Sequence, residues 1–274
     1  MTKNLLRFLA KGLLALGALL VFLHCDLIKY HPYDTKVSGE INHNEKAIEE
    51  IQQRLKDKSE FKFALIGDSH RWYDELGDVV DALNKVEDLD FVIHSGDVTD
   101  MGITQQYEWS QRILKRLKVP YIVILGNHDM LGNGFEVYKT MYGAENFSFE
   151  LNDIQFVCVN TNGLEFNDNQ PIPDFVFLND KIKNYPEQCK RTIVVMHAPP
   201  LSEQFTEENS ALFEETILRF PNLMFCLYGH VHLLNAKTLF DDHVMYYSND
   251  KIKDKVFQLF TVKQDSYDYQ QISL

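Results

Sequence analysis

The chain has 274 residues, 45% of them hydrophobic, which is sufficient for one large domain with a single core, or for one domain with appendages. Its formal net charge at pH 7 is −13. So acidic a surface repels long polyanions and argues against a nucleic-acid polymer as the partner.

Residues 1–24 have the composition of an export signal. Three basic residues precede or border the apolar run "GLLALGALLVFL" (residues 12–23), an order typical of a signal peptide. The run is shorter than the ~20 residues that span a bilayer, although an uncleaved membrane anchor remains an alternative. Cys25 closely follows the run, which resembles a bacterial lipoprotein signal whose cysteine becomes the acylated N-terminus. We therefore expect an exported cell-envelope lipoprotein, periplasmic or on the outer face, attached to the membrane by this lipid or by the uncleaved signal.

Residues 25–58 are polar and mixed, and they are predicted to form a tether followed by one helix near Asn44 to Leu55. His31 and His43 lie in this stretch and are expected to be solvated. The remaining residues, 59–274, are predicted to form a single domain.

From Phe61 onward, short apolar runs alternate with helical patterns. Strands are predicted at "FKFALIG", "LDFVIHSG", "PYIVILG", "RTIVVMH" and "LMFCLYG", and helices over residues 73–86, 104–117, 134–142 and 207–219. This alternation indicates an α/β architecture. The tail from Ala236 has four further strand patterns, which suggest a second, more antiparallel sheet packed on the first.

Each of these five runs ends in side chains that can bind a metal. They are Asp68 and His70, Asp97, Asn127 with His128 and Asp129, His197, and finally His230 with His232. The ligand crevice of an α/β sheet lies at the carboxyl ends of its strands, so these groups are expected to meet. Glycines at 67, 96, 126 and 229 directly precede polar residues and allow sharp turns. A strand-end Asp often caps a helix, but the joint occurrence predicts a metal site.

The motifs "GDSH", "GDVTD", "GNHD", "MH" and "GHVH" resemble, in this order, those of calcineurin-like metallophosphoesterases, over about residues 61–234. The resemblance implies an α/β fold in which a two-sheet β-sandwich is flanked by helices in four layers. It also implies a phosphoric ester hydrolase with two divalent or mixed-valence transition metals. By the same resemblance, Asp68, His70 and His232 bind the first metal, Asn127, His197 and His230 bind the second, and Asp97 bridges them.

Mixed nitrogen and oxygen ligation suits Mn, Fe, Zn or Co and does not choose among them. Two such cations ~3.5–4 Å apart hold both sides of an in-line phosphoryl displacement and give a metal-bound hydroxide nucleophile. The expected substrates are small phosphomonoesters or phosphodiesters. A non-phosphate metallohydrolase and a non-catalytic surface-binding lipoprotein are the alternatives. The second of these is disfavoured because all seven ligand positions are present.

His128 is not a ligand in the family pattern, and the resemblance implies that it is the general acid for the leaving-group oxygen. Asp129 would orient it, with a turn or cap residue as the alternative. His94 belongs either to the support of the site or to the core.

Three residues near the proposed ligands bear on the substrate. Asp100 stands where purple acid phosphatases have an iron-binding tyrosine, so no purple colour is implied. Arg71 and Trp72 follow His70 directly. They either pair with a substrate phosphate and wall the pocket, or are a surface arginine and a packing tryptophan.

Overall fold

The computed structural model describes residues 7–8, 11–14, 31, 33–165 and 172–274 of the chain. Cys25 and most of the apolar run before it lie outside these residues, so the lipidation predicted there stays a prediction. Within the described ranges, no helix combines the length and the apolar composition that crossing a bilayer requires.

The first sheet has five strands in the order β11-β10-β1-β2-β3. Its members are β1 (Phe61–Ile66), β2 (Phe91–His94), β3 (Tyr121–Val123), β10 (Val256–Val262) and β11 (Tyr267–Ser273). β1, β2 and β3 are parallel, whereas β10 pairs antiparallel with β1. Since the three parallel strands end at one edge of the sheet, the residues that follow them are brought together there.

The second sheet has six strands in the order β4-β5-β6-β7-β9-β8. Its members are β4 (Phe147–Leu151), β5 (Ile154–Val159), β6 (Arg191–Met196), β7 (Leu223–Tyr228), β8 (Asn235–Thr238) and β9 (Met245–Ser248). β5, β6, β7 and β9 are parallel, and the edge strands β4 and β8 are antiparallel to their neighbours.

The expectation that the tail forms a second sheet of its own is wrong. Its first two strands, β8 and β9, extend the sheet that contains β6 and β7, while β10 and β11 extend the sheet that contains β1. The local pattern of a strand specifies which of its faces is buried, but its pairing partner depends on contacts far away in sequence. The tail therefore completes both sheets.

The two sheets pack face to face as a sandwich. Side chains alternate along β1, so Phe63 points into the space between the sheets while Ala64 points to the outer face. Across the interface, the ring of Phe63 lies 6.1 Å from that of Phe156, and the ring of Phe225 lies 5.3 Å from that of Phe260. These contacts join strands of the two sheets into one core.

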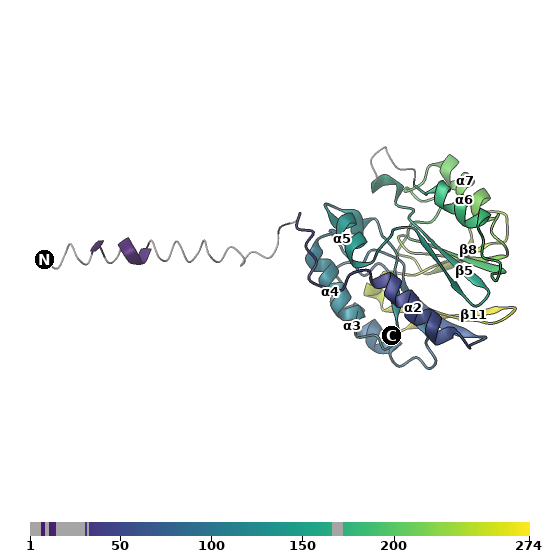
Figure 1. Ribbon diagram of the computed structural model, residues 1–274, viewed down its shortest axis with the longest axis horizontal. Helices are drawn as coiled ribbons and strands as arrows, with labels where there is room; N and C mark the ends of the chain where they lie inside the picture. The colour runs from purple at the N-terminus through teal and green to yellow at the C-terminus, as the bar shows by residue number, and fades with distance from the viewer. Residues whose placement is uncertain (1–6, 9–10, 15–30, 32, 166–171) are drawn as a thin grey trace.

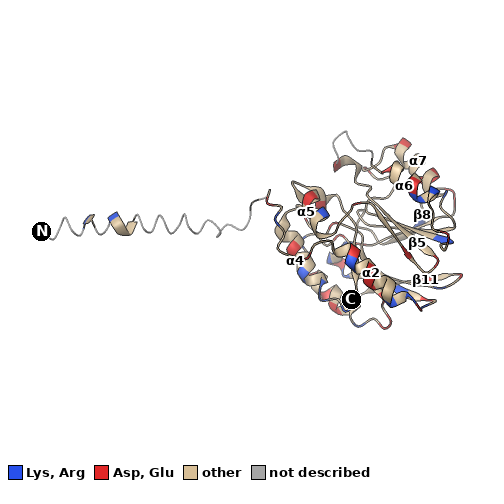
Figure 2. Ribbon diagram, viewed as in Figure 1, with Lys and Arg blue, Asp and Glu red and all other residues tan. Residues whose placement is uncertain are grey.

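Helices cover the outer face of each sheet (Figure 1). α3 (Tyr73–Leu83), α4 (Thr104–Leu114) and α5 (Gly134–Met141) pack on the first sheet, and α6 (Phe175–Lys183) and α7 (Glu207–Ile217) pack on the second. The order helix, sheet, sheet, helix is the predicted four-layer α/β fold, which is confirmed. Charged residues lie on outer helices such as α4 and α6 (Figure 2), as expected for solvated faces.

The helix predicted near Asn44 begins at His43 and is α2 (His43–Leu55). His43 is buried, its Nε2 lies 3.0 Å from the carbonyl oxygen of Tyr121, and its ring packs 4.1 Å from the Tyr121 ring. The expectation of a solvated His43 is therefore wrong, because α2 packs on β3 and its Ala47, Ile51 and Leu55 enter the core between the sheets. His31, by contrast, is exposed.

Candidate metal centre

The residues predicted as ligands lie just beyond the carboxyl ends of β1, β2, β3, β6 and β7. Five of them adopt positive φ angles, namely Asp68 at 50°, His70 at 44°, Asp97 at 56°, His230 at 68° and His232 at 51°. Such angles are uncommon for residues other than glycine, and strained backbone of this kind clusters at functional sites. The strand-end loops are thus bent so that these side chains converge.

His230 and His232 show what this bending does. Had the strand continued through both, their side chains would point the same way. Instead β7 ends at Tyr228 and the left-handed backbone separates the two rings. His230 faces Asn127, whereas His232 faces Asp68.

Asp68, His70 and His232 form the first group of converging ligand atoms. His232 Nε2 lies 3.3 Å from Asp68 Oδ1 and 3.4 Å from His70 Nε2. Ligand atoms that are each ~2.1 Å from one metal lie about 3.0–3.4 Å apart in octahedral or tetrahedral geometry. The spacing therefore fits three ligands of one cation.

Asn127, His197 and His230 form the second group. Asn127 Oδ1 lies 3.1 Å from His197 Nε2 and 3.0 Å from His230 Nδ1. An amide oxygen and two imidazole nitrogens at this spacing suit a transition metal.

Asp97 lies between the two groups. Its Oδ2 is 3.6 Å from His70 Nε2 in the first group and 3.3 Å from His197 Nε2 in the second. Its Oδ1 accepts a hydrogen bond of 2.9 Å from the backbone N–H of His128. One carboxylate oxygen thus faces both groups of ligand atoms, which we call the first and the second half-site. This is the placement that a bridging ligand needs.

The charges of the centre are interdependent. Burial alone would raise the pKa of Asp97, but neighbouring His197 and His70 lower it below its usual range. Burial alone would lower the pKa of His197, but the Asp97 and Asp68 carboxylates raise it to about 9. Burial lowers the pKa of His230. Ionised buried carboxylates beside imidazoles attract positive charge, and this donor set fits divalent cations.

Three groups that were not predicted from the sequence hold the proposed ligands in place. The Ser95 carbonyl oxygen lies 2.7 Å from His197 Nδ1, and the Asn249 side chain donates to Asp68 Oδ2 at 2.9 Å. Glu203 Oε1 lies 2.5 Å from His230 Nε2. Each partner fixes the ring or carboxylate that it contacts. Asn249 directly follows β9, so the strand-end rule could have found it, whereas Glu203 lies in a polar loop without such a signal.

The His128 ring lies at the edge of the first half-site, with its centroid 4.6 Å from that of His70. It belongs to the short 3-10 helix η2 (His128–Met130). Its Nδ1 donates to the backbone carbonyl of Asp100 at 2.9 Å, because a carbonyl oxygen only accepts. The ring is therefore oriented, with Nε2 as its second functional atom.

The expected role of Asp129 in orienting His128 is wrong in this structure. The buried Asp129 carboxylate accepts hydrogen bonds from the N–H and hydroxyl of Thr99 at 2.9 and 3.0 Å, and from the Gly126 N–H at 3.0 Å. Burial and the nearby Asp97 raise its pKa to about 7. Asp129 thus joins the loops after β2 and β3, which corresponds to the alternative reading of a turn residue.

His94 lies beneath the centre and is fully buried. Its Nε2 is 3.0 Å from the Ser69 hydroxyl, and the Gly96 N–H donates to its Nδ1 at 3.3 Å. Burial lowers its pKa to about 4, so the ring is neutral at pH 7. His94 therefore supports the loops that carry Asp68 and Asp97 and is not itself placed as a ligand.

Arg71 and Trp72 have partners other than a substrate. The exposed Arg71 guanidinium lies 3.3 Å from the Asp100 carboxylate and 5.9 Å from the centre of the Trp72 ring. Trp72 packs against the core on the outer face of the first sheet. The centre of its ring lies 5.4 Å from that of His70, in an edge-to-face arrangement. Trp72 thus both packs and borders the centre, while Arg71 is at the surface.

Two glycines permit the close approach of the ligand loops. A Cβ at Gly96, whose φ is +105°, would lie 2.6 Å from His197 Nδ1. A Cβ at Gly126 would lie 2.1 Å from Asp97 Oδ1. A side chain at either position would displace a proposed ligand.

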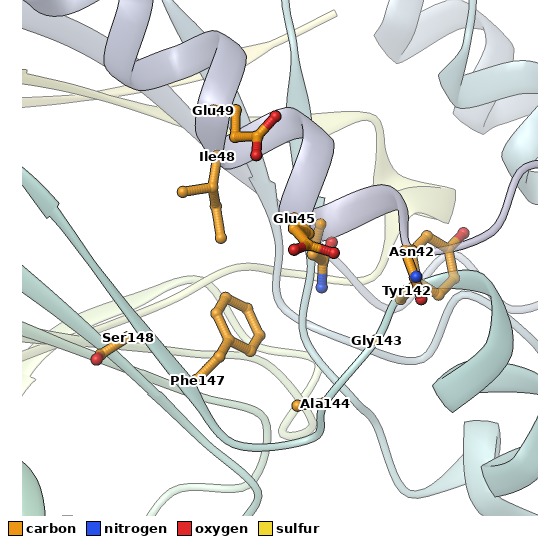
Figure 3. A pocket seen from close by; sticks show the side chains of 10 residues that line it. Asn42, Glu45, Ile48, Glu49, Tyr142, Gly143, Ala144, Phe147 and Ser148 are labelled. Carbon is orange, nitrogen blue, oxygen red and sulfur yellow. The ribbon is translucent and has the colours of Figure 1, made fainter.

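A cavity of about 420 Å³ lies elsewhere, between α2 and the chain around the start of β4 (Figure 3). Apolar Ile48 and Phe147 and acidic Glu45 and Glu49 are among its lining residues. None of the proposed ligands lines it, so it is separate from the metal centre.

The chain is similar in sequence to curated proteins that include two phosphodiesterases. A 3′,5′-cyclic-nucleotide phosphodiesterase of Nostoc sp. is 24% identical over 161 residues, which are 53% of this chain and 56% of that protein. The glycerophosphodiester phosphodiesterase GpdQ of Enterobacter lignolyticus is 26% identical over 176 residues, 57% of this chain and 61% of that protein. The chain thus spans less than two thirds of the length of either relative.

Solved structures share the fold. The purple acid phosphatase PPD1 of yellow lupin matches with a TM-score of 0.58 at 13% identity, covering 78% of this chain and 52% of that one. GAP50 of Plasmodium matches with a TM-score of 0.59 at 14% identity, covering 79% and 85%. The family model of the calcineurin-like phosphoesterases matches residues 61–234, well over half of the chain. The chain therefore belongs to the calcineurin-like phosphoesterase family.

Proposed function

We propose that the protein hydrolyses small phosphomonoesters or phosphodiesters with a dinuclear centre of Mn, Fe, Zn or Co. The observation that carries this proposal is the position of Asp97 Oδ2, at 3.6 Å from His70 Nε2 and 3.3 Å from His197 Nε2. Asp68, His70 and His232 would hold one divalent cation, Asn127, His197 and His230 would hold the other, and bound cations would supply stabilisation of charge on the phosphoryl group and a lowered pKa of a bound water.

The chain's own residues position the cations and the proton donor. Asp97 supplies charge to both half-sites, and the neutral oxygen of Asn127 limits the total negative charge. His128 keeps one proton on Nδ1, bonded to the Asp100 carbonyl, and carries the transferable proton on Nε2. From Nε2 it protonates the leaving-group oxygen. Asp129 holds the turn on which Asn127 and His128 lie.

The related proteins support inclusion of diesters among the substrates, since two of them are named as phosphodiesterases. The acidic body of the chain, with a net charge of −13, disfavours polymeric polyanions. We therefore place the substrate among small phosphate esters.

Metal reconstitution followed by a substrate panel tests the proposal. The panel contains an aryl phosphomonoester, an aryl phosphodiester, a cyclic nucleotide and a nucleotide, assayed with each of the four metals. The expected result is about two metals per chain by elemental analysis and metal-dependent release of alcohol or phosphate. One metal per chain would overturn the dinuclear centre, and inactivity on the whole panel would overturn the substrate class.

We further propose that the protein is exported and anchored in the cell envelope through a lipid on Cys25, with the uncleaved signal as the other route to the membrane. The support is the order of basic segment, apolar run and cysteine in residues 1–25. Metabolic labelling with a palmitate analogue should mark the wild-type chain and not Cys25→Ser. Equal labelling of both would reject lipidation at Cys25.

A further inference from the structure

Four large apolar side chains are exposed on loops that border the metal centre. They are Met101 at 56% exposure, Leu164 at 64%, Leu201 at 58% and Leu233 at 60%. These loops follow β2, β5, β6 and β7, so all four side chains lie at the end of the sandwich where the ligands converge. We call these four residues the apolar rim. Single exposed apolar residues are ordinary, but four on the loops of one site are not.

Two members of the rim are tied to the centre by sequence. Met101 follows Asp100, whose carboxylate is 3.7 Å from His70 Nδ1 and whose carbonyl orients His128. Leu233 directly follows His232, a proposed ligand. Both residues therefore lie on loops that carry groups of the first half-site.

The other two members are tied to the centre through the loop that carries Glu203. Leu201 lies two residues before Glu203, which contacts His230. The backbone N–H of Leu164 donates at 3.0 Å to the side chain of Gln204. Leu164 and Leu201 thus belong to two loops that pack together beside the second half-site.

Leu201 is held in a conformation that is unfavourable for leucine. Its φ is +68°, and its N–H donates at 3.0 Å to the hydroxyl of the buried Ser210 on α7. Glycine or asparagine would adopt this backbone more easily. A strained leucine whose side chain faces solvent points to a role for that side chain outside the core.

We propose that the apolar rim binds the alcohol portion of the substrate, and that the preferred substrates are phosphate esters of apolar, alkyl-type alcohols. This inference rests on the proposed function, since it takes the phosphate to lie at the metal centre. An ester whose phosphorus is there must extend its organic group past the loops that carry the rim. An alkyl chain in that position covers apolar surface that is otherwise in water.

A series of p-nitrophenyl alkyl phosphodiesters, from ethyl to octyl, tests this. The leaving group is constant, so only the retained alkyl group changes. A fully buried methylene gives about a fourfold gain, and contact with a half-exposed rim should give about twofold in kcat/KM per methylene. Calorimetry with n-alkylphosphonates, which are not hydrolysed, measures the same slope as affinity on the metal-reconstituted protein.

The variants are chosen to separate the rim from the fold. In the double variant Leu201→Asn with Leu233→Asn, the gain in kcat/KM for each added methylene, called the slope, should fall towards onefold. Asparagine is used because it tolerates the left-handed backbone at Leu201. Leu233→Asn alone should reduce the slope and leaves the strained position untouched. The matched control is Leu212→Asn with Leu218→Asn, two exposed leucines on and just after α7, outside the loops that carry the apolar rim. Its slope should equal that of the wild type.

The outcomes distinguish failure of the apolar rim from failure of the proposed function. A wild-type slope near onefold, with hydrolysis present, overturns the apolar rim and leaves the proposed function intact. If no ester is hydrolysed, the proposed function fails, and the phosphonate affinities still decide whether the rim binds alkyl chains. If the rim variant alters only the sedimentation of the protein and not the slope, the rim is a contact between copies of the chain and the inference is withdrawn.

Discussion

Removal of the Glu203 carboxylate should weaken metal binding at the second half-site. Glu203 Oε1 lies 2.5 Å from His230 Nε2, while His230 Nδ1 lies 3.0 Å from Asn127 Oδ1. The carboxylate accepts a hydrogen bond from Nε2–H, so the lone pair of Nδ1 is left for the cation. In Glu203→Ala the ring loses this partner and rotates more freely.

The size of the effect follows from exposure. Loss of a carboxylate behind a metal-binding histidine typically weakens metal affinity by about 10- to 100-fold. The Glu203 side chain is 65% exposed, so water replaces part of the lost hydrogen bond, and we expect the lower end, about tenfold. Burial of His230, whose side chain is 11% exposed, prevents full compensation.

The assay is a metal titration in competition with a chelator, which reports affinity without turnover. Glu208→Ala is the control, because it removes the same charge from an exposed position in the first turn of α7. The titration of Glu203→Ala should show one weakened metal and one of wild-type affinity. Unchanged affinity for both metals would refute the reasoning, and so would an equal loss in Glu208→Ala, since that would assign the effect to charge alone.

Three other changes address the bridge, the general acid and a buried carboxyl group. Asp97→Asn should lose at least one of two metals by elemental analysis, because it weakens both half-sites, and full metal content would exclude the bridge. His128→Ala should keep its metals and lose about 10²–10⁴-fold in rate on an alkyl ester but less on a nitrophenyl ester, whereas equal losses would exclude the general acid. Burial raises the pKa of Glu214 from 4.5 to about 8, so the unfolded chain releases its proton first and the fold loses stability as pH rises between these values. Between pH 5 and pH 8, the free energy of unfolding should fall less in Glu214→Gln than in the wild type, by up to about 4 kcal/mol, as measured by denaturation at both pH values. Parallel pH profiles of the two proteins would contradict this prediction.

The positions of most strands and helices were predictable from the sequence, because buried apolar residues recur along each element with a short and characteristic spacing. The run "FKFALIG" became β1, and the pattern over residues 207–219 became α7. Strand β4 and helix α6 were not predicted, since each is short and only partly buried. The division of the tail between two sheets depends on pairing such as that of Phe63 with Phe260, which no local pattern encodes.

The burial of His43 illustrates the same limit for a single residue. Its neighbours in sequence are polar, and only the packing of α2 on β3 removes it from water. Once there, it needs a partner, which the Tyr121 carbonyl supplies. A polar sequence neighbourhood therefore does not predict a solvated side chain.

The proposed metal ligands are easier to recognise in the sequence than the groups that support them, and the backbone explains why. A side chain that binds a metal must end in a suitable oxygen or nitrogen atom, so Asp68 or His232 is conspicuous in the sequence. A supporting contact needs only a hydrogen-bonding group, and Ser95 and Asp100 supply it to His197 and His128 from main-chain carbonyls, which every residue has. Because side-chain identity carries no information about such contacts, substitution cannot remove them directly. The Glu203 and Asn249 contacts are made by side chains, so mutation can test them.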